Sequence, residues 1–256
     1  MCLILFAYRV HLRAPLVVAA NRDEFYARPA AHAHYWPDAP HIYAGRDTQA
    51  GGTWLGVNRQ GRFAAVTNFA ESAAVEAPAS RGALTADFLN TSDSAWDYAN
   101  AIDGRRFAGF SLLLFDGQDM VYLSNRNSGP KYLQPGLYGL ANTHLDTGWP
   151  KVRRGKQALA TALDQAEPPD PDRLLQLLAD DTQPPDAELP QRGRDLEVER
   201  RVAPCFIRGE QYGTRASTAV IFLDDAIIVR EQSYGPHGQV GDHAQARVPL
   251  DTRSLS

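Results

Sequence analysis

CLILFAYRV (residues 2–10) and PLVVAA (residues 15–20) are the two apolar runs that follow Met1 at the start of the chain. Both runs are short and end in polar or charged residues, which is typical of β-strands. The second run is almost continuously apolar, so it favours a strand that is buried on both faces. The start of the chain is therefore expected to form a β-sheet that other elements pack against on both faces.

The same signals recur along the chain and predict its other elements. Strands are predicted at Leu3–Val10, Pro15–Ala20, Thr53–Asn58, Phe63–Asn68, Phe110–Phe115, Met120–Ser124, Leu137–Asn142, Phe206–Arg208, Ser217–Leu223 and Ile227–Gln232. Helices are predicted at Gly82–Leu89, Ser94–Ile102, Val152–Gln165 and Asp172–Asp180, and a Pro-rich surface loop at Gln183–Gly193. Runs of strands separated by runs of helices predict an α+β fold. We expect a four-layer αββα sandwich of mixed, largely antiparallel sheets.

Length and composition describe an ordinary globular protein. The 256 residues carry a formal net charge of −4, and 44% of them are hydrophobic, so we expect one domain over residues 1–256. The acidic balance argues against nucleic acid and anionic membranes as partners. No apolar run reaches the roughly 20 residues that span a bilayer, and the start does not resemble a signal peptide, so a cytoplasmic protein is expected. Cys2 and Cys205 are expected to be reduced thiols, Cys205 in the core, although one bridge between them remains open.

Cys2 is the residue with the most specific chemistry. Removal of Met1 would leave a nucleophilic thiol beside an α-amine, which titrates at roughly 7.7 to 8.0 and can accept the thiol proton. One residue would then supply both the nucleophile and the base. The alternative is a small apolar residue at the start of a buried strand.

Several polar residues stand at predicted strand ends. In the cluster Asn21-Arg22-Asp23-Glu24, strand alternation places the first and third side chains on one face, so the Asp23 carboxylate could orient an amine. Asn68 and Asn142 follow apolar strands and could donate to an oxyanion. Arg215 precedes a strongly apolar strand and could meet Asp23 or a substrate carboxylate. The alternatives are a solvated strand end, two turn residues and a surface arginine.

Together these segments resemble the NRDE family, the family of the transport and Golgi organisation protein 2. The resemblance is carried by an ordered set that spans almost the whole chain: Met1-Cys2, Asn21-Arg22-Asp23-Glu24, Gly51-Gly52-Thr53-Trp54-Leu55-Gly56, Thr67-Asn68-Phe69, Ser80-Arg81-Gly82, Ala141-Asn142-Thr143, Trp149-Pro150-Lys151-Val152 and Tyr212-Gly213-Thr214-Arg215. This family has been linked to Golgi organisation, haem trafficking and acyl-CoA or lipid metabolism. The resemblance itself supplies no reaction.

More distantly, the pattern is similar to N-terminal nucleophile hydrolases of the penicillin V acylase and bile salt hydrolase type, which are αββα sandwiches. This resemblance implies that Cys2 attacks an amide carbonyl, that Asp23 orients the α-amine, and that Asn68 and Asn142 line the oxyanion hole. Arg215 would complete the charge network. Those hydrolases carry an arginine three residues before the aspartate, where this chain has Ala20.

Two functions from different classes follow. The first is a cysteine-dependent hydrolase of a non-peptide amide or acyl substrate, which needs no cofactor. The second is a non-catalytic protein that binds or carries haem, acyl-CoA or lipid on the same fold. Asn21, Arg22, Trp54, Phe69 and Trp149 are the expected substrate contacts, although aromatic residues are more often core. His32, His34, His41 and His144 are candidate haem ligands, none of them marked by its spacing, and no metal site is expected.

Overall fold

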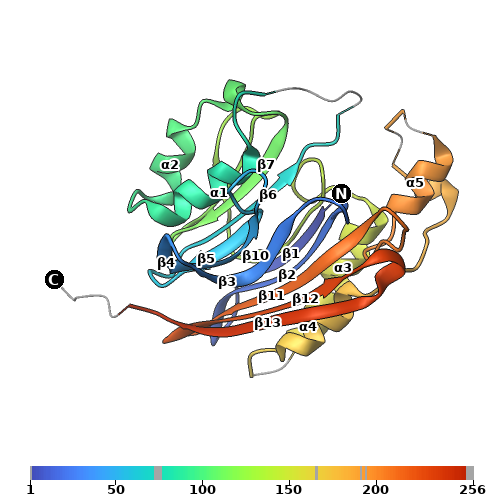
Figure 1. Cartoon of the computed structure of the whole chain (residues 1–256). Helices are drawn as coiled ribbons and strands as arrows, with labels where there is room; N and C mark the ends of the chain where they lie inside the picture. The colour runs from blue at the N-terminus through green and yellow to red at the C-terminus, as the bar shows by residue number, and fades with distance from the viewer. Residues whose placement is uncertain (1, 72–76, 165–166, 191, 194, 252–256) are drawn as a thin grey trace.

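The computed structural model describes residues 2–71, 77–164, 167–190, 192–193 and 195–251, and two large sheets dominate it (Figure 1). The first sheet has the strand order β10-β1-β2-β11-β12-β13, and the second β3-β4-β5-β6-β7-β8-β9. The first is built from β1 (Cys2–His11), β2 (Ala14–Phe25), β10 (Gly136–Leu140), β11 (Tyr212–Phe222), β12 (Ala226–Tyr234) and β13 (Val240–Pro249). The second is built from β3 (Ala30–Trp36), β4 (Ala39–Asp47), β5 (Leu55–Asn58), β6 (Phe63–Asn68), β7 (Phe110–Phe115), β8 (Met120–Ser124) and β9 (Lys131–Tyr132). Neighbouring strands in both sheets pair antiparallel.

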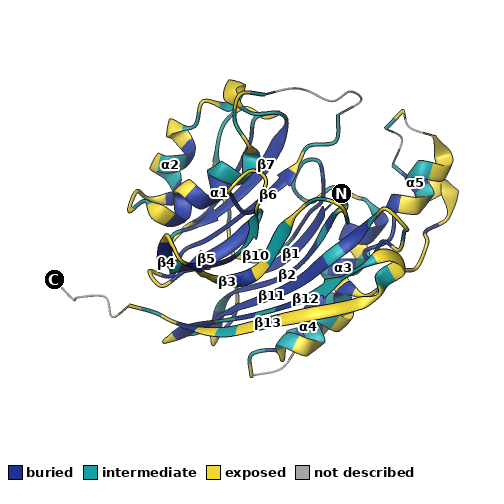
Figure 2. Cartoon of the chain, in the orientation of Figure 1, coloured by how far each residue is buried: buried dark blue, intermediate teal, exposed yellow. Residues whose placement is uncertain are grey.

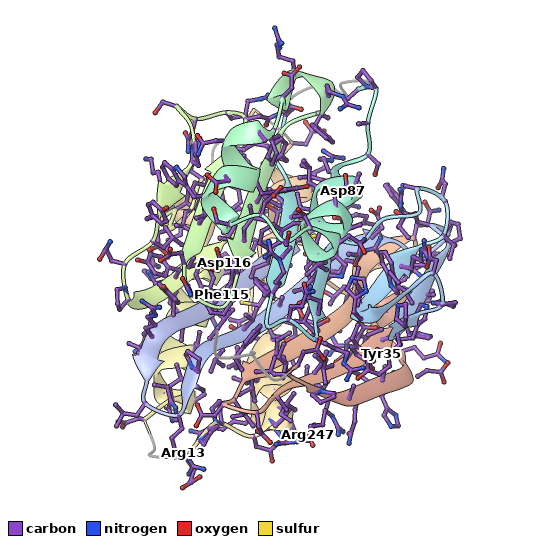
Figure 3. All side chains as sticks on the ribbon, turned by 90° about the vertical axis from the view of Figure 1, so that its left-hand side faces the viewer. Arg13, Tyr35, Asp87, Phe115, Asp116 and Arg247 are labelled. Carbon is purple, nitrogen blue, oxygen red and sulfur yellow. The ribbon has the colours of Figure 1, made fainter. Side chains whose placement is uncertain are left out.

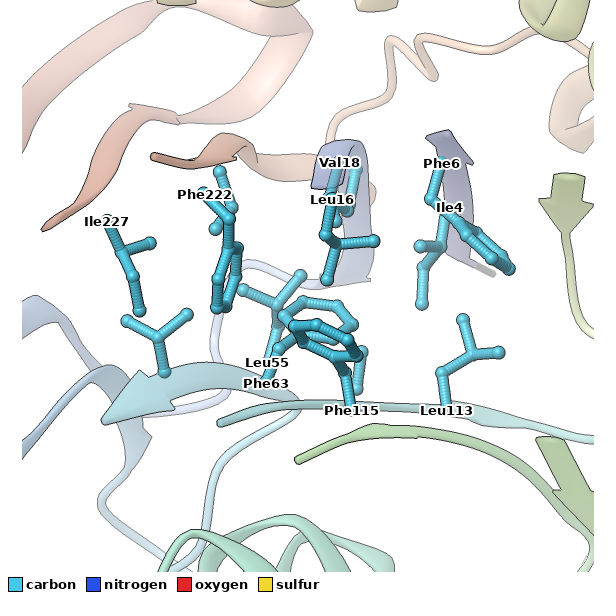
Figure 4. Close-up of a cluster of buried hydrophobic side chains, with 14 of the residues drawn as sticks. Ile4, Phe6, Leu16, Val18, Leu55, Phe63, Leu113, Phe115, Phe222 and Ile227 are labelled. Atoms are coloured by element: carbon cyan, nitrogen blue, oxygen red, sulfur yellow. The ribbon is translucent and has the colours of Figure 1, made fainter. Parts of the chain in front are cut away.

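The largest hydrophobic cluster fills the space between the two sheets. Phe63 and Phe115 from the second sheet meet Phe222 from the first in Figure 4, and the rings of Phe115 and Phe222 lie edge to face with centroids 5.3 Å apart. Aromatic rings dominate such cores because each buries a large area and offset or edge-on pairs are favoured. Contact between the sheets therefore holds the two central layers together.

Helices cover the outer face of each sheet (Figure 1). On the second sheet α1 (Arg81–Asn90) and α2 (Ala95–Ala101) bury a separate cluster that includes Phe88 and Leu112. On the first sheet α3 (Pro150–Ala162) and α4 (Pro171–Leu178) bury another that includes Leu5 and Leu159. The predicted αββα sandwich is confirmed, and so is the α+β class. A fifth helix, α5 (Leu196–Val202), lies near the N-terminal end of α3, where Lys151 donates to the Val202 carbonyl.

Local sequence explains where several elements begin and turn. Ser94 caps α2, since its hydroxyl accepts from the backbone N–H of Asp97. In the hairpin from β7 to β8, Asp116 Oδ1 accepts from the backbone N–H groups of Gln118 and Asp119. Gly117, which directly follows Asp116, has φ +92°, a conformation that glycine adopts without strain. The hairpin that the Asp-Gly pair predicted is therefore present.

Some predicted elements differ from the structure. Phe206–Arg208 was expected to be a strand, but it is irregular: Phe206 N–H donates to the carbonyl of Asp180, and Ile207 N–H donates to the hydroxyl of Thr214. The strands β3, β4, β9 and β13 and the helix α5 were not predicted. In β13 most residues are exposed (Figure 2), so it lacks the apolar pattern that marks a strand. The predicted helix end at Gln165 lies outside the described residues.

Charged side chains on the outer surface form ion pairs. Arg13 and Arg247 project outward in Figure 3, and each pairs with a carboxylate, on Glu167 and Asp225. None of the described helices is both long enough and apolar enough to cross a membrane.

Candidate active site

A cavity of about 510 Å³ lies at the edge where strands of both sheets end. Cys2 and Arg22 reach it from β1 and β2, and Asn68 reaches it from β6. Trp54, just before β5, also lines it. Polar groups gathered at strand ends in a concave site are the usual setting of a binding or catalytic centre.

Cys2 is fixed in this cavity through its backbone. Its nitrogen donates to Asn142 Oδ1 at 2.5 Å, and Asn142 Nδ2 in turn donates to the backbone carbonyl of Asn68 at 2.9 Å. The thiol lines the cavity while the residue is only 9% exposed. Burial raises the pKa of the thiol, and the neighbouring Asp23 carboxylate acts in the same direction. With a raised pKa the thiol stays protonated at neutral pH, so attack needs a local base.

The two asparagines have different surroundings. The Asn142 side chain accepts a hydrogen bond from the Cys2 backbone nitrogen through Oδ1 and donates one to the Asn68 carbonyl through Nδ2. It therefore holds the start of β1 against the end of β6. Asn68 is among the residues that line the cavity, whereas Asn142 is not. Of the two predicted oxyanion donors, Asn68 has the position that suits the role better.

Asp23 also lines the cavity, although it is only 3% exposed. Its Oδ1 accepts from the hydroxyl of Thr214 at 2.7 Å. Burial raises the pKa of Asp23, although the Lys151 ammonium and the Thr214 hydrogen bond oppose that shift. Asn21 points to the same side of β2, where its amide donates to the carbonyls of Leu178 and Cys205. The alternation that the sequence predicted for Asn21 and Asp23 is thus observed.

Lys151 is a site residue to which the sequence pattern assigned no role. It stands in the first turn of α3, is 3% exposed, and donates from Nζ to the carbonyl of Val202 at 3.1 Å. Burial lowers the pKa of Lys151, whereas the Asp23 carboxylate raises it. The ammonium therefore faces the same buried layer as Asp23, on the outer side of the first sheet. A lysine inside the otherwise apolar Trp-Pro-Lys-Val motif is the signal that could have identified it.

Arg215 occupies an irregularity of β11. The register pairs Thr214 with Asp23 and then Ala216 with Arg22, which leaves Arg215 as the extra residue of a β-bulge. Bulges re-aim a side chain, and they are common beside active sites. Arg215 lines the cavity and donates from Nη1 to the backbone carbonyls of Phe25 and Arg28.

The other predicted contacts divide into two groups. Arg22 and Trp54 line the cavity, whereas Asn21, Phe69 and Trp149 are not part of its lining. The Phe69 ring packs edge to face against His144, and the Arg192 guanidinium lies 4.6 Å above the Trp149 ring. These two aromatic residues serve packing where they stand.

Gly82 lines the cavity, and Gly52 packs directly against its backbone. A Cβ on Gly52 would lie 2.4 Å from the backbone carbon of Gly82, and Thr53 N–H donates to the Gly82 carbonyl at 3.2 Å. The absence of a side chain at Gly52 thus lets the first turn of α1 approach the chain before β5. The Gly-Gly-Thr-Trp and Ser-Arg-Gly segments of the sequence meet at this contact.

The thiols and histidines outside this centre carry little chemistry. Cys2 and Cys205 are free thiols. Cys205 is in the helix-covered core, as predicted, where burial raises its pKa to about 11. Within the described residues no group of three or more His, Cys, Asp or Glu side chains is arranged to hold a metal ion.

Comparison with solved structures gives the class of fold. The chain is similar to the C2A mutant of conjugated bile acid hydrolase from Clostridium perfringens, with a TM-score of 0.54 and 9% identity over 100% of both chains. The chain therefore shares the sandwich fold of that hydrolase.

The sequence gives the family. The profile of the Transport and Golgi organisation 2 family matches residues 1–233, and the chain belongs to that family. It is 34% identical to the Transport and Golgi organization protein 2 homolog of Bos taurus and 33% identical to that of Homo sapiens, in each case over 86% of this chain and 88% of the relative. It is 28% identical to Transport and Golgi organization protein 2 of Drosophila melanogaster, over 88% of this chain and 89% of that protein.

Proposed function

We propose that the protein is a cysteine N-terminal nucleophile hydrolase that cleaves a non-peptide amide or related acyl substrate after Met1 has been removed. The observation that carries the proposal is the setting of Cys2, whose thiol lines the cavity while its backbone nitrogen is held by Asn142. Once Met1 is gone, that nitrogen is an α-amine, and its pKa near neutrality suits a general base.

In the proposed reaction the α-amine takes the thiol proton, and Cys2 Sγ forms a bond to the carbonyl carbon of the substrate. The carbonyl oxygen becomes an oxyanion, which the Asn68 amide can stabilise by about 3 kcal/mol. Collapse of this intermediate breaks the carbon–nitrogen bond, and the leaving amine takes the proton from the α-ammonium. Water then attacks the thioester, which releases the acid and restores the thiol.

Asp23 and Lys151 support this chemistry through their charges. An ionised Asp23 favours the charged α-ammonium that forms during the first step. Lys151 opposes the effect of burial on Asp23 and so helps to keep the carboxylate ionised. Lys151 thus places a positive charge near Asp23. Related hydrolases have an arginine three residues before the aspartate, where this chain has Ala20.

The experiment is a substrate screen with protein that has its native N-terminus, using amides that release a chromogenic amine. Cys2→Ala should lower turnover by about 10³-fold or more, because no other group would replace the nucleophile. Cys205→Ala is the matched control, since it removes the other buried thiol and should leave turnover unchanged. Turnover that survives Cys2→Ala would contradict the proposal.

A second candidate function is a carrier that binds acyl compounds without cleaving them. It applies if no base takes the proton of the Cys2 thiol, because burial raises the pKa of this thiol and a protonated thiol is a poor nucleophile. A carrier should bind its ligand equally well when Met1 is retained, whereas the hydrolase should not turn over. Measuring binding and turnover on both forms distinguishes the two functions.

Haem as the carried ligand fits the described residues poorly. His32 is the histidine that lines the cavity, but its Nδ1 lies 3.1 Å from the Ser233 hydroxyl, and its Nε2 lies 3.7 Å from an Asp242 oxygen. An axial ligand must present a ring nitrogen to the iron. Both nitrogens of His32 already face polar neighbours, so no step is assigned to haem.

A further inference from the structure

Five arginines line the cavity, and they differ in how their charge is compensated. Arg28 pairs with Asp47 at 2.7 Å. Arg46 is bound by both oxygens of Asp38, which lies outside the cavity lining. The other three, Arg22, Arg81 and Arg215, have no carboxylate within 4.0 Å among the described residues. These three form the arginine cluster.

The three arginines are partly desolvated, and two of them, Arg22 and Arg215, lie close enough to repel each other. Burial lowers the pKa of Arg215, and the neighbouring Arg22 guanidinium lowers it further. Burial likewise lowers the pKa of Arg81, while the fields of Glu71 and Cys2 oppose that shift. Partly buried cations without ion pairs are costly, because desolvation is not repaid by an opposite charge. An anion bound beside the Cys2 thiol would supply the opposite charge that the arginine cluster lacks.

The hydrogen bonds of the cluster leave donors unused. Arg81 donates to the Gly109 carbonyl, and Arg215 donates to two backbone carbonyls. The Arg22 side chain makes no hydrogen bond to the described residues, although it is half-buried in the cavity wall. A guanidinium has five N–H donors in a planar fork that matches a carboxylate or a phosphate.

The acidic residues of the cavity do not cancel this charge. The lining carboxylates are Asp23, Glu24, Asp47, Glu231 and Asp242. Asp47 is taken by Arg28, Asp23 is held on the far side of β2 by Thr214, and burial raises the pKa of Glu231, which favours its neutral form. Asp242 is exposed and faces His32. Among the described lining residues, Glu24 and the exposed Asp242 are then the two carboxylates left to balance three guanidinium groups.

We propose that the cavity binds its substrate through an oxyanionic group, a carboxylate or a phosphate, held by Arg22, Arg81 and Arg215. The proposal deepens the hydrolase proposed above and rests on it for the bond that reacts. The oxyanion occupies the cluster, and the acyl carbon lies over Cys2. Backbone N–H groups at the start of α1, beside Ser80 and Gly82 in the lining, add favourable dipoles for the same anion.

The first test compares two alkylating agents of similar size on Cys2, in protein with its native N-terminus. Iodoacetate carries a carboxylate and iodoacetamide is neutral, so the ratio of their rates, relative to the same ratio for free N-acetylcysteine, reports the local preference for an anion. We expect this relative ratio to be about tenfold or more, as for other charge-lined clefts. Arg22→Gln and Arg81→Gln should each lower it several-fold, whereas Arg22→Lys should retain part of it.

Arg153→Gln is the matched control, because it removes the same charge from the exposed face of α3, where Arg153 pairs with Glu188. It should leave the ratio unchanged, since distant surface charges are screened. Circular dichroism of each variant verifies that the chain folds. A wild-type ratio equal to that of the free thiol would overturn the proposal.

A second measurement needs no reaction at Cys2. Succinate and inorganic phosphate are titrated into the wild-type protein and Arg22→Gln, with chloride at equal ionic strength as the reference. We expect one of the two anions to raise Tm in the wild-type protein by several degrees and to have little effect on the variant, and the more effective anion identifies the carboxylate or the phosphate class. If neither anion raises Tm above the chloride reference, the oxyanion site is wrong. An inert Cys2 together with a clear anion effect would instead reject the hydrolase and retain the site.

Discussion

At the scale of single residues, the site depends on buried polar groups that hold one another in place. Cys2, Asn142 and the backbone of Asn68 form one chain of hydrogen bonds, and Asp23 with Thr214 forms another pair below it. Buried groups of this kind are costly to leave without partners, so each fixes the position of the next. Two further buried residues, Lys151 and Glu231, lead to predictions.

Lys151→Met should alter the pH dependence of the proposed reaction. Without the ammonium, one of the groups that oppose the effect of burial on Asp23 is lost, so the pKa of this carboxyl should rise. The carboxylate supports catalysis only when ionised, so the acidic limb of the turnover profile should move to higher pH. The measurement is turnover against pH for the wild-type protein and the variant.

Lys151→Arg should restore most of the profile, because it returns a cation to the same place. Lys156→Met is the matched control on the same helix, where Lys156 pairs with Asp146 at the surface. A loss of activity without movement of the limb would show that Lys151 serves folding alone.

Glu231→Gln should stabilise the protein at neutral pH. Glu231 is 6% exposed, and burial raises its pKa in the folded state above the unfolded value of about 4.3. Folding therefore favours the protonated form: the stabilisation is complete below about pH 4.3 and is lost as pH rises through the folded pKa. Gln can accept from Ala33 N–H as Glu231 does, so at pH 7 we expect a gain in the free energy of unfolding.

The measurement is the free energy of unfolding in urea at pH 4 and at pH 7. The gain should be present at pH 7 and almost absent at pH 4. Glu188→Gln, at an exposed ion pair with Arg153, is the control and should change little at either pH. An equal effect of Glu231→Gln at both pH values would mean that the pKa of this carboxyl is not raised by folding.

At the scale of elements, the close approach of Gly52 to Gly82 sets the position of α1. Gly52→Ala would place a methyl group 2.4 Å from the Gly82 backbone carbon, and backbone atoms cannot move aside as a flexible side chain can. We expect a loss of about 1 to 3 kcal/mol in the free energy of unfolding and a displaced wall of the cavity.

Gly148→Ala is the control for that prediction, because a Cβ there meets nothing within 4 Å. Thermal unfolding and the rate of Cys2 labelling by iodoacetamide measure both effects. Wild-type stability in Gly52→Ala would mean that α1 does not depend on this contact.

Elements with strong periodic signals could be predicted from the sequence, and the others could not. β7 and β8 were predicted with their observed bounds, because both faces of each strand are buried and the Asp-Gly turn between them is distinctive. β13 and β3 were missed, since their exposed residues break the apolar pattern. Phe206–Arg208 has strand-forming residues, but its backbone donors are bound by a helix-layer carbonyl and a threonine hydroxyl instead of a neighbouring strand.

At the scale of the whole molecule, the site exists only where the two sheets and α3 meet. The sequence could single out Cys2, Asp23 and the asparagines as candidates because they stand at strand ends and belong to a recognisable ordered set. It could not place Lys151 or show that Asn142 binds the Cys2 backbone, because these contacts join segments far apart in the chain. Strand alternation explains why the Asn21 side chain faces the helices. Asn21 was nevertheless expected to contact the substrate, and it does not line the cavity.

The proposed function requires that Cys2 becomes an N-terminal nucleophile inside the cavity. Intact mass spectrometry of protein with its native N-terminus, before and after treatment with a thiol-reactive acyl probe, examines this requirement without a known substrate. We expect loss of Met1 and a single acyl group that maps to Cys2, because burial raises the pKa of the Cys205 thiol to about 11 and keeps it unreactive. A retained Met1 together with an unlabelled Cys2 would contradict the hydrolase.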